Sequence, residues 1–268
     1  MGFFERVSNG ISIGFHSIFF PIRQPRLYIY SLFQLILMSG GMYYLNRMMP
    51  MSTQFLISFI GTAFVYSFFY TGVCLGSVAS IRTVINTYEE RPLPGFFQSM
   101  YVSLLSLGYL FLIAFVSFFL SNFITYGPIK LYPILGYSCF FLGFLLAIAV
   151  PFFIPTLLYE YSTFSIMLKR SFMRFLNNIV LLLSTCLTYV FILSIFVLGM
   201  ILSFALQFGP EVLANLQGKS EVEFLALFQD AWYLLVIYFV ISWFVFTGSN
   251  VVIPTLYDYI VSEPSSFK

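Results

Sequence analysis

The sequence predicts an all-α, polytopic membrane protein with six transmembrane helices arranged as three hairpins, plus interfacial amphipathic helices. Two observations predict this class. Charged residues make up 8% of the 268 residues and hydrophobic residues 60%, and the charges stand in short clusters between long uncharged segments. About 20 apolar residues suffice for a helix to cross roughly 30 Å of hydrocarbon, so each of these segments is long enough to span a membrane.

The uncharged segments place the spans. We expect them near residues 27–46, 52–80, 100–122, 132–157, 178–207 and 231–257. Helices are favoured over barrel strands, because apolar runs such as residues 110–116 do not alternate with polar residues. Spans and short connections use nearly the whole chain, so residues 1–268 are predicted to form a single integral membrane domain.

Residues 1–22 are predicted to form an amphipathic helix that lies in the membrane interface. Large apolar residues recur there at helical spacing, with charged and small polar residues between them. We expect Pro21 and Pro25 to end this helix before the first span. The apolar residues of the pattern are Phe4, Val7, Ile11, Phe15, Ile18 and Phe19.

Basic residues predict the orientation, because cytoplasmic connections carry an excess of Lys and Arg. With six spans, nine basic residues fall on the side that holds both termini, and three fall on the opposite side. Both termini are therefore expected in the cytoplasm, and the location is the cytoplasmic (inner) cell membrane. The nine are Arg6, Arg23, Arg26, Arg82, Arg91, Lys169, Arg170, Arg174 and Lys268, and the three are Arg47, Lys130 and Lys219.

Spans four and six end in similar sequence segments, which suggests an internal repeat of hairpins. Residues 154–160 read IPTLLYE and residues 253–258 read IPTLYD; a looser third copy is found at residues 81–85. The segments that follow spans two and four, residues 96–100 and 168–172, also resemble each other. Chance similarity in a chain rich in Phe, Leu and Ile is the alternative. Within the repeat, Pro155 and Pro254 are predicted to break their helices.

The repeat also suggests an ionic contact at the inner surface. Glu160 and Asp258 follow the two prolines, and Arg82 occupies the corresponding position of the looser copy. We hypothesise that Arg82 pairs with Glu160 or Asp258 and draws the three helix ends together. The alternative is that all three side chains face water and lipid headgroups.

A second amphipathic helix is predicted over residues 160–178. It carries Lys169, Arg170 and Arg174 away from its apolar face. At the inner surface these side chains would meet anionic lipid, at about 1 kcal/mol each. They could serve as a topology anchor or as a specific lipid-binding site.

Residues that could carry chemistry are few. No ionisable residue lies in the middle of a predicted span, and Gln34 is the nearest polar candidate; such a residue is more typical of a hydrogen bond between helices than of a substrate contact. The chain has one His, and its three Cys show no ligand spacing. The sequence thus predicts no catalytic residue, metal site, cofactor or nucleic-acid partner.

Small residues at helical spacing predict close helix packing. Gly72 and Gly76 form a GxxxG pattern that Ser80 extends by one turn. The helix that packs there could come from the same chain or from a second copy in a homo-oligomer.

The sequence resembles a group of uncharacterised prokaryotic integral membrane proteins with six spans, classed as a domain of unknown function. The shared features are Pro25-Arg26-Leu27 before span one, the exit from span two at Arg82–Met100, and the exit from span four at Val150–Pro155 with the Lys169-Arg170-Ser171 helix after it. The resemblance implies the six-span topology. It assigns no activity.

Taken together, these features predict a non-enzymatic membrane protein that acts through helix packing and through contacts with membrane lipid or a membrane-protein partner. The alternative is a transporter or channel for weakly charged or lipid-like solutes. Its binding site would then be lined by uncharged polar and aromatic side chains.

Overall fold

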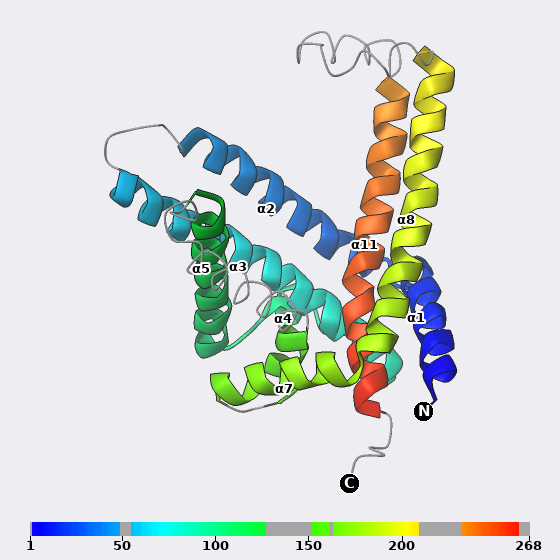
Figure 1. Cartoon of the computed structure of the whole chain (residues 1–268), viewed down its shortest axis with the longest axis horizontal. Helices are drawn as coiled ribbons and strands as arrows, with labels where there is room; N and C mark the ends of the chain where they lie inside the picture. The colour runs from blue at the N-terminus through cyan, green and yellow to red at the C-terminus, as the bar shows by residue number, and fades with distance from the viewer. Residues whose placement is uncertain (1, 49–54, 127–151, 161–162, 209–231, 263–268) are drawn as a thin grey trace. The chain divides into compact units, whose positions relative to one another are not determined.

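The computed structural model of the chain describes residues 2–48, 55–126, 152–160, 163–208 and 232–262. Most of these residues are helical, with no strand in the described ranges (Figure 1). Three helices contain segments long and apolar enough to cross a membrane: Ile60–Tyr88, Ile179–Gln207 and Trp232–Ser262. The prediction of an all-helical chain with apolar helices fit for membrane insertion is therefore confirmed. The chain divides into two compact units.

One unit comprises residues 1–24 and 180–252 and contains α1 (Phe3–Arg23), nearly all of α8 (Ile179–Phe208) and the larger part of α11 (Trp232–Ser262). α1 packs on α8 through its smallest residues. A Cβ atom at Gly10 would lie 2.7 Å from the carbonyl oxygen of Leu181, and one at Gly14 would lie 2.9 Å from Cβ of Thr188. Any side chain beyond hydrogen at Gly10 or Gly14 would therefore force the two helices apart.

The large apolar residues of α1 are divided between exposed and buried positions. Phe4 is 86% exposed and Phe19 is 53% exposed, whereas Ile18 is buried. The sequence predicts that Pro21 and Pro25 end the helix; α1 continues past Pro21 and ends at Arg23, two residues before Pro25. A proline this close to the last residue removes only one intrahelical hydrogen bond, so the final turn persists.

α8 and α11 run antiparallel, as two tyrosine hydroxyls show. Tyr189 donates to the carbonyl oxygen of Val245 at 2.6 Å, and Tyr238 donates to that of Met200 at 3.0 Å. These bonds satisfy the hydroxyl groups inside an apolar helix pair.

The other unit comprises residues 25–179 and 253–268. α2 (Arg26–Met48) runs antiparallel to α3 (Phe55–Tyr88). A Cβ atom at Gly72 would lie 2.7 Å from Cδ1 of Leu37, and one at Gly76 would collide with the side chain of Gln34. The helix that packs on this GxxxG pattern is therefore α2 of the same chain.

α3 also packs against α5 (Leu104–Tyr126) and the short helix α4 (Phe96–Met100). The predicted third span at 100–122 is thus shifted, because the chain leaves helical geometry at Tyr101 and resumes it at Leu104. Of the predicted fourth span, residues 132–151 lie outside the described residues, and residues 152–159 are helical.

Pro155 and Pro254 do not end their helices, so the prediction that they are helix-breaking is wrong. The helix of residues 152–159 continues past Pro155, and α11 continues past Pro254 to Ser262. Both prolines are buried. Inside packed helices, neighbouring groups can compensate for the single hydrogen bond that a proline removes.

Candidate functional site: a polar cluster at the helix ends

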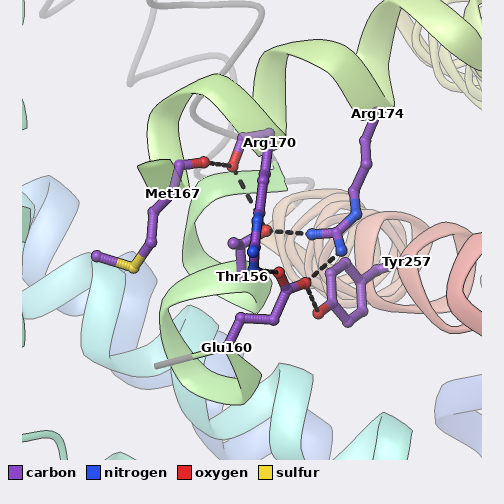
Figure 2. A network of polar contacts seen from close by, with 7 residues as sticks. Thr156, Glu160, Met167, Arg170, Arg174 and Tyr257 are labelled. Atoms are coloured by element: carbon purple, nitrogen blue, oxygen red, sulfur yellow. Dashed lines mark hydrogen bonds and ion pairs between the residues drawn. The ribbon is translucent and has the colours of Figure 1, made fainter. Parts of the chain in front are cut away.

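The main concentration of charge contacts in the second unit lies around Glu160, which follows the helix of residues 152–159. Figure 2 shows Arg170 and Arg174 approaching this carboxylate from α7 (Phe164–Asn177), and Tyr257 approaching it from α11. We call Thr156, Glu160, Arg170, Arg174 and Tyr257 the Glu160 cluster. Its members come from two neighbouring segments, residues 152–160 and α7, and from α11, which is remote along the chain.

Glu160 is bonded on both carboxylate oxygens. Arg170 donates from Nη1 to Oε2 at 2.9 Å, Arg174 donates from Nη2 to Oε1, and the Tyr257 hydroxyl donates to Oε1 at 3.0 Å. The Glu160 side chain is only 19% exposed. Such charge-assisted hydrogen bonds are about twice as strong as neutral ones.

Arg174 is the central cation of the cluster. Besides its ion pair, it donates from Nη1 to the Thr156 hydroxyl at 2.8 Å, and its guanidinium lies 5.2 Å from the centre of the Tyr257 ring. The planar guanidinium can make all these contacts at once, which a lysine ammonium could not.

The environment of Glu160 keeps it ionised. Partial burial acts to raise the pKa of its carboxyl, but the hydrogen bonds from Arg170, Arg174 and Tyr257 and the charge of Arg174 outweigh burial and hold the pKa below its ordinary value. The cluster therefore carries one negative and two positive charges near neutral pH.

The buried residues of α7 show which of its faces packs against the rest of the unit. Met167 and Ser171 are its buried residues, and Ser171 donates to the carbonyl oxygen of Met167 and toward the Thr156 hydroxyl. Arg174 therefore faces the interior of the unit, and Arg170 keeps about half of its side chain exposed. Of the three basic residues predicted to face lipid, Lys169 and Arg170 are exposed, whereas Arg174 is bonded within the cluster.

The prediction that Arg82 pairs with Glu160 or Asp258 is wrong: neither ion pair is found among the described residues. Arg82 donates from Nη1 to the carbonyl oxygens of Gln98 and Ser99, at 2.9 and 3.1 Å. It thus caps the C-terminal end of α4, where unpaired carbonyl groups attract a cation. Glu160 is satisfied instead by the two arginines of α7.

α4 is held from α2 as well. The Tyr30 hydroxyl donates to the Ser99 hydroxyl at 3.1 Å, and the Tyr30 ring stacks on Phe96 at 5.5 Å. Arg26 donates to the carbonyl oxygen of Pro94 at 3.2 Å. Three side chains from two long helices thus fix this five-residue helix.

The ends of α3 and α11 also meet near the Glu160 cluster. The hydroxyls of Tyr88 and Thr255 lie 3.2 Å apart, and the rings of Tyr159 and Tyr257 are 6.3 Å apart. Burial raises the pKa of Tyr159 to about 12; the charge of Arg82 opposes this effect, and the charge of Asp258 makes a smaller contribution in the same direction as burial. Asp258, predicted as a partner of Arg82, is thus half-buried near Tyr159.

Thr156, Ser171 and Tyr257 are members or neighbours of the cluster that sequence reasoning did not single out. The repeat contained the signal for them. Thr156 and Thr255 follow the two prolines, and both are buried and bonded to another segment. Ser99 and Ser171 occupy matching places in the two surface helices, and both are fully buried and hydrogen-bonded.

Gln34 lies apart from the cluster and joins two helices. It is buried, and its Nε2 donates to the carbonyl oxygen of Val73 at 3.1 Å and to the Ser77 hydroxyl at 2.9 Å. Ser80, the last residue of the small stripe, donates to the carbonyl oxygen of Gly76 within α3. These polar groups are used in holding α2 and α3 in place.

The chemistry that the described residues bring together is that of ion pairing. Within the described ranges, no group of three or more His, Cys, Asp or Glu side chains is close enough to hold a metal ion. His16 is on α1, and burial, followed by the charge of Arg23, lowers the pKa of its imidazole. Comparison with protein-family models, with curated proteins and with solved structures finds no match.

Proposed function

We propose that this chain is a six-span protein of a prokaryotic cytoplasmic membrane, with both termini in the cytoplasm. It acts without catalysis, through helix packing and through contacts with membrane lipid or a membrane-protein partner. We also propose that the chain belongs to the six-span family that its sequence resembles. The main support for this proposal is that polar side chains in the described residues bond helices to one another.

Those polar side chains join helices to one another. Gln34 bonds α2 to α3, the Glu160 cluster bonds α7 to α11, and Tyr189 bonds α8 to α11. A transporter would need comparable groups facing a path for solute. Two buried hydroxyl residues, Ser67 and Thr247, donate to carbonyl oxygens of their own helices.

The outward surface supports lipid as the main contact. α8 exposes a long series of aliphatic and aromatic side chains, with Leu187 68% exposed and Phe191 63% exposed. Exposing these side chains to water is unfavourable in free energy, whereas exposing them to hydrocarbon is not.

Cysteine labelling in intact cells tests the topology. After Cys74, Cys139 and Cys186 are replaced by Ala, single cysteines are placed at Lys130, Lys219, Glu90 and Lys169. A membrane-impermeant maleimide is expected to label the first two before lysis and the other two only after lysis. Labelling of Glu90→Cys or Lys169→Cys in intact cells would overturn the proposed orientation.

Native mass spectrometry tests the mode of action. The detergent-extracted protein is expected to carry phospholipid or a second membrane protein. A polar or weakly charged solute that is retained, and that is transported in proteoliposomes, would favour the transporter instead.

A further inference from the structure

The exposed face of α7 combines apolar and basic side chains. Its members follow one another at the spacing i, i+3, i+4, i+7 and i+10, which places them on one side of a helix. Three are apolar and about 45% exposed, and the other two are exposed cations; the buried Met167 and Ser171 lie on the opposite side. The five residues of the exposed face are Ile166, Lys169, Arg170, Met173 and Leu176.

The positive charge of this face is not cancelled within its own segment. Residues 160–178 contain three basic residues and one acidic residue, Glu160. Arg174 pairs with Glu160 and is only 21% exposed, so it compensates that carboxylate inside the unit. Lys169 is exposed, and Arg170 remains 52% exposed while donating from Nη1 to Glu160. The exposed face therefore keeps a positive charge that an anion can neutralise.

α7 is joined directly to a helix that can cross a membrane. Its last residue is Asn177, and α8 begins at Ile179, where a segment long and apolar enough to span a bilayer also begins. Because consecutive Cα atoms are about 3.8 Å apart, the end of α7 lies within roughly 7.6 Å of the start of that segment. The chain thus holds α7 where α8 enters the apolar layer.

The cytoplasmic surface of a bilayer is complementary to such a face. Its anionic lipids create a negative surface potential that attracts Lys and Arg. The apolar side chains of an interfacial helix enter the boundary between headgroups and acyl chains, and long basic side chains reach back to the headgroups. Anionic phospholipid therefore supplies both the negative charge and the hydrocarbon that this face lacks.

We propose that the exposed face of α7 binds anionic phospholipid of the cytoplasmic leaflet. Lys169 and Arg170 contact the headgroups, and Ile166, Met173 and Leu176 contact the upper parts of the acyl chains. The inference rests on the proposed function, because α8 must cross a bilayer for lipid to surround α7. It deepens that function by naming the class of lipid, which is one with a net negative charge.

A fluorescent label on α7 tests the proposal locally. After Cys74, Cys139 and Cys186 are replaced by Ala, Met173→Cys is labelled with bimane, and the full chain is reconstituted in nanodiscs that contain phosphatidylcholine and phosphatidylglycerol. A small fraction of either lipid carries a nitroxide on one acyl chain near the glycerol and quenches the label. Spin-labelled phosphatidylglycerol is expected to quench at least about fivefold more effectively, because the cations of the face favour the charged lipid.

Variants at Lys169 show whether the charge of the face causes this preference. Lys169→Glu leaves the face without net positive charge and is expected to abolish the preference for phosphatidylglycerol, whereas Lys169→Arg, the matched control, is expected to keep it. Lys169 is not a member of the Glu160 cluster, so both variants retain the contacts of Glu160. Ile166→Cys, a second exposed position of the face, repeats the measurement. Equal quenching by the two lipids at both label positions, or a preference that survives Lys169→Glu, would overturn the proposal.

A label on α8 separates this result from the fate of the proposed function. Leu187 is 68% exposed on α8, and Leu187→Cys is expected to be quenched equally by the two lipids. If Leu187→Cys is quenched but neither label on α7 prefers phosphatidylglycerol, the inference about α7 fails alone. If neither lipid quenches Leu187→Cys, α8 does not contact the bilayer and the proposed function fails as well.

Discussion

The unit that contains α1 and α8 joins its helices where side chains are nearly absent, whereas the unit that contains α7 joins them through long charged ones. In the first, Gly10 and Gly14 let α1 lie directly on α8. In the second, Arg174 crosses from α7 to the carboxylate of Glu160, which also accepts a hydrogen bond from Tyr257 of α11.

The two kinds of contact differ in the solvent that they tolerate. Close contact between small residues needs no charge, so it works inside the apolar layer. An ion pair is costly there, but at the headgroup level its charges stay partly hydrated and can still bind each other. In the Glu160 cluster, Arg170 keeps about half of its side chain exposed, so its charge can stay partly hydrated.

The largest expected effect is that of removing the carboxylate. Glu160→Ala leaves Arg170 and Arg174 without their common partner and should lower the free energy of unfolding by about 2–4 kcal/mol. Thermal unfolding in detergent, followed by intrinsic fluorescence, measures it. Glu89→Ala is the matched control: Glu89 pairs with Arg91 at 3.1 Å, but the Arg91 side chain is 61% exposed and that of Glu89 is 37% exposed, so the change should stay below about 1 kcal/mol. Equal losses of stability in Glu160→Ala and Glu89→Ala would show that the Glu160 cluster stabilises the fold no more than a surface ion pair does.

The contact of Gly10 and Gly14 with α8 should be nearly as sensitive to substitution. Gly10→Leu places atoms where Ser184 and the Leu181 carbonyl group stand, and the overpacking should cost about 1–3 kcal/mol. A disulfide or crosslink between α1 and α8 should then form more slowly in the variant. Gly199→Leu, a change in open space, should leave stability unchanged; a comparable loss there would contradict this account of α1.

The stability of the unit that contains the Glu160 cluster should depend on pH. Folding lowers the pKa of Glu160 below its ordinary value of 4.5. Its contribution to stability is therefore fully present above that value and is lost as the pH falls through the lower pKa of the folded state. The difference in unfolding temperature between wild type and Glu160→Gln should be constant above about pH 5 and shrink below it. A difference that grows on acidification would show that the carboxylate is not held ionised.

The smallest effect is expected at the helix pair α2–α3. Gln34→Leu removes hydrogen bonds to Val73 and Ser77, but such bonds between membrane helices average only about 0.6 kcal/mol. Gln207→Leu, at the exposed end of α8, serves as the neutral comparison in the same unfolding assay. A loss above about 2 kcal/mol would mean that Gln34 holds more than this helix pair.

Much of the local structure could be predicted, because uncharged runs and helical spacing act over neighbouring residues. The span predicted at 178–207 matches α8 within one residue at each end, and the helix predicted at 1–22 matches α1 closely. The errors concern prolines and long-range pairing. Pro254 lies inside a helix, since the surrounding residues pack well enough to continue it.

By itself, the sequence determined that the chain is helical and apolar, since composition and periodicity reflect the solvent that each residue meets. Only the tertiary structure decided which charges bind each other. Arg82 and Arg174 looked alike as basic residues near helix ends, but one caps α4 and the other binds Glu160. Partner choice depends on the distances between helix ends, and the packing of the helices sets those distances.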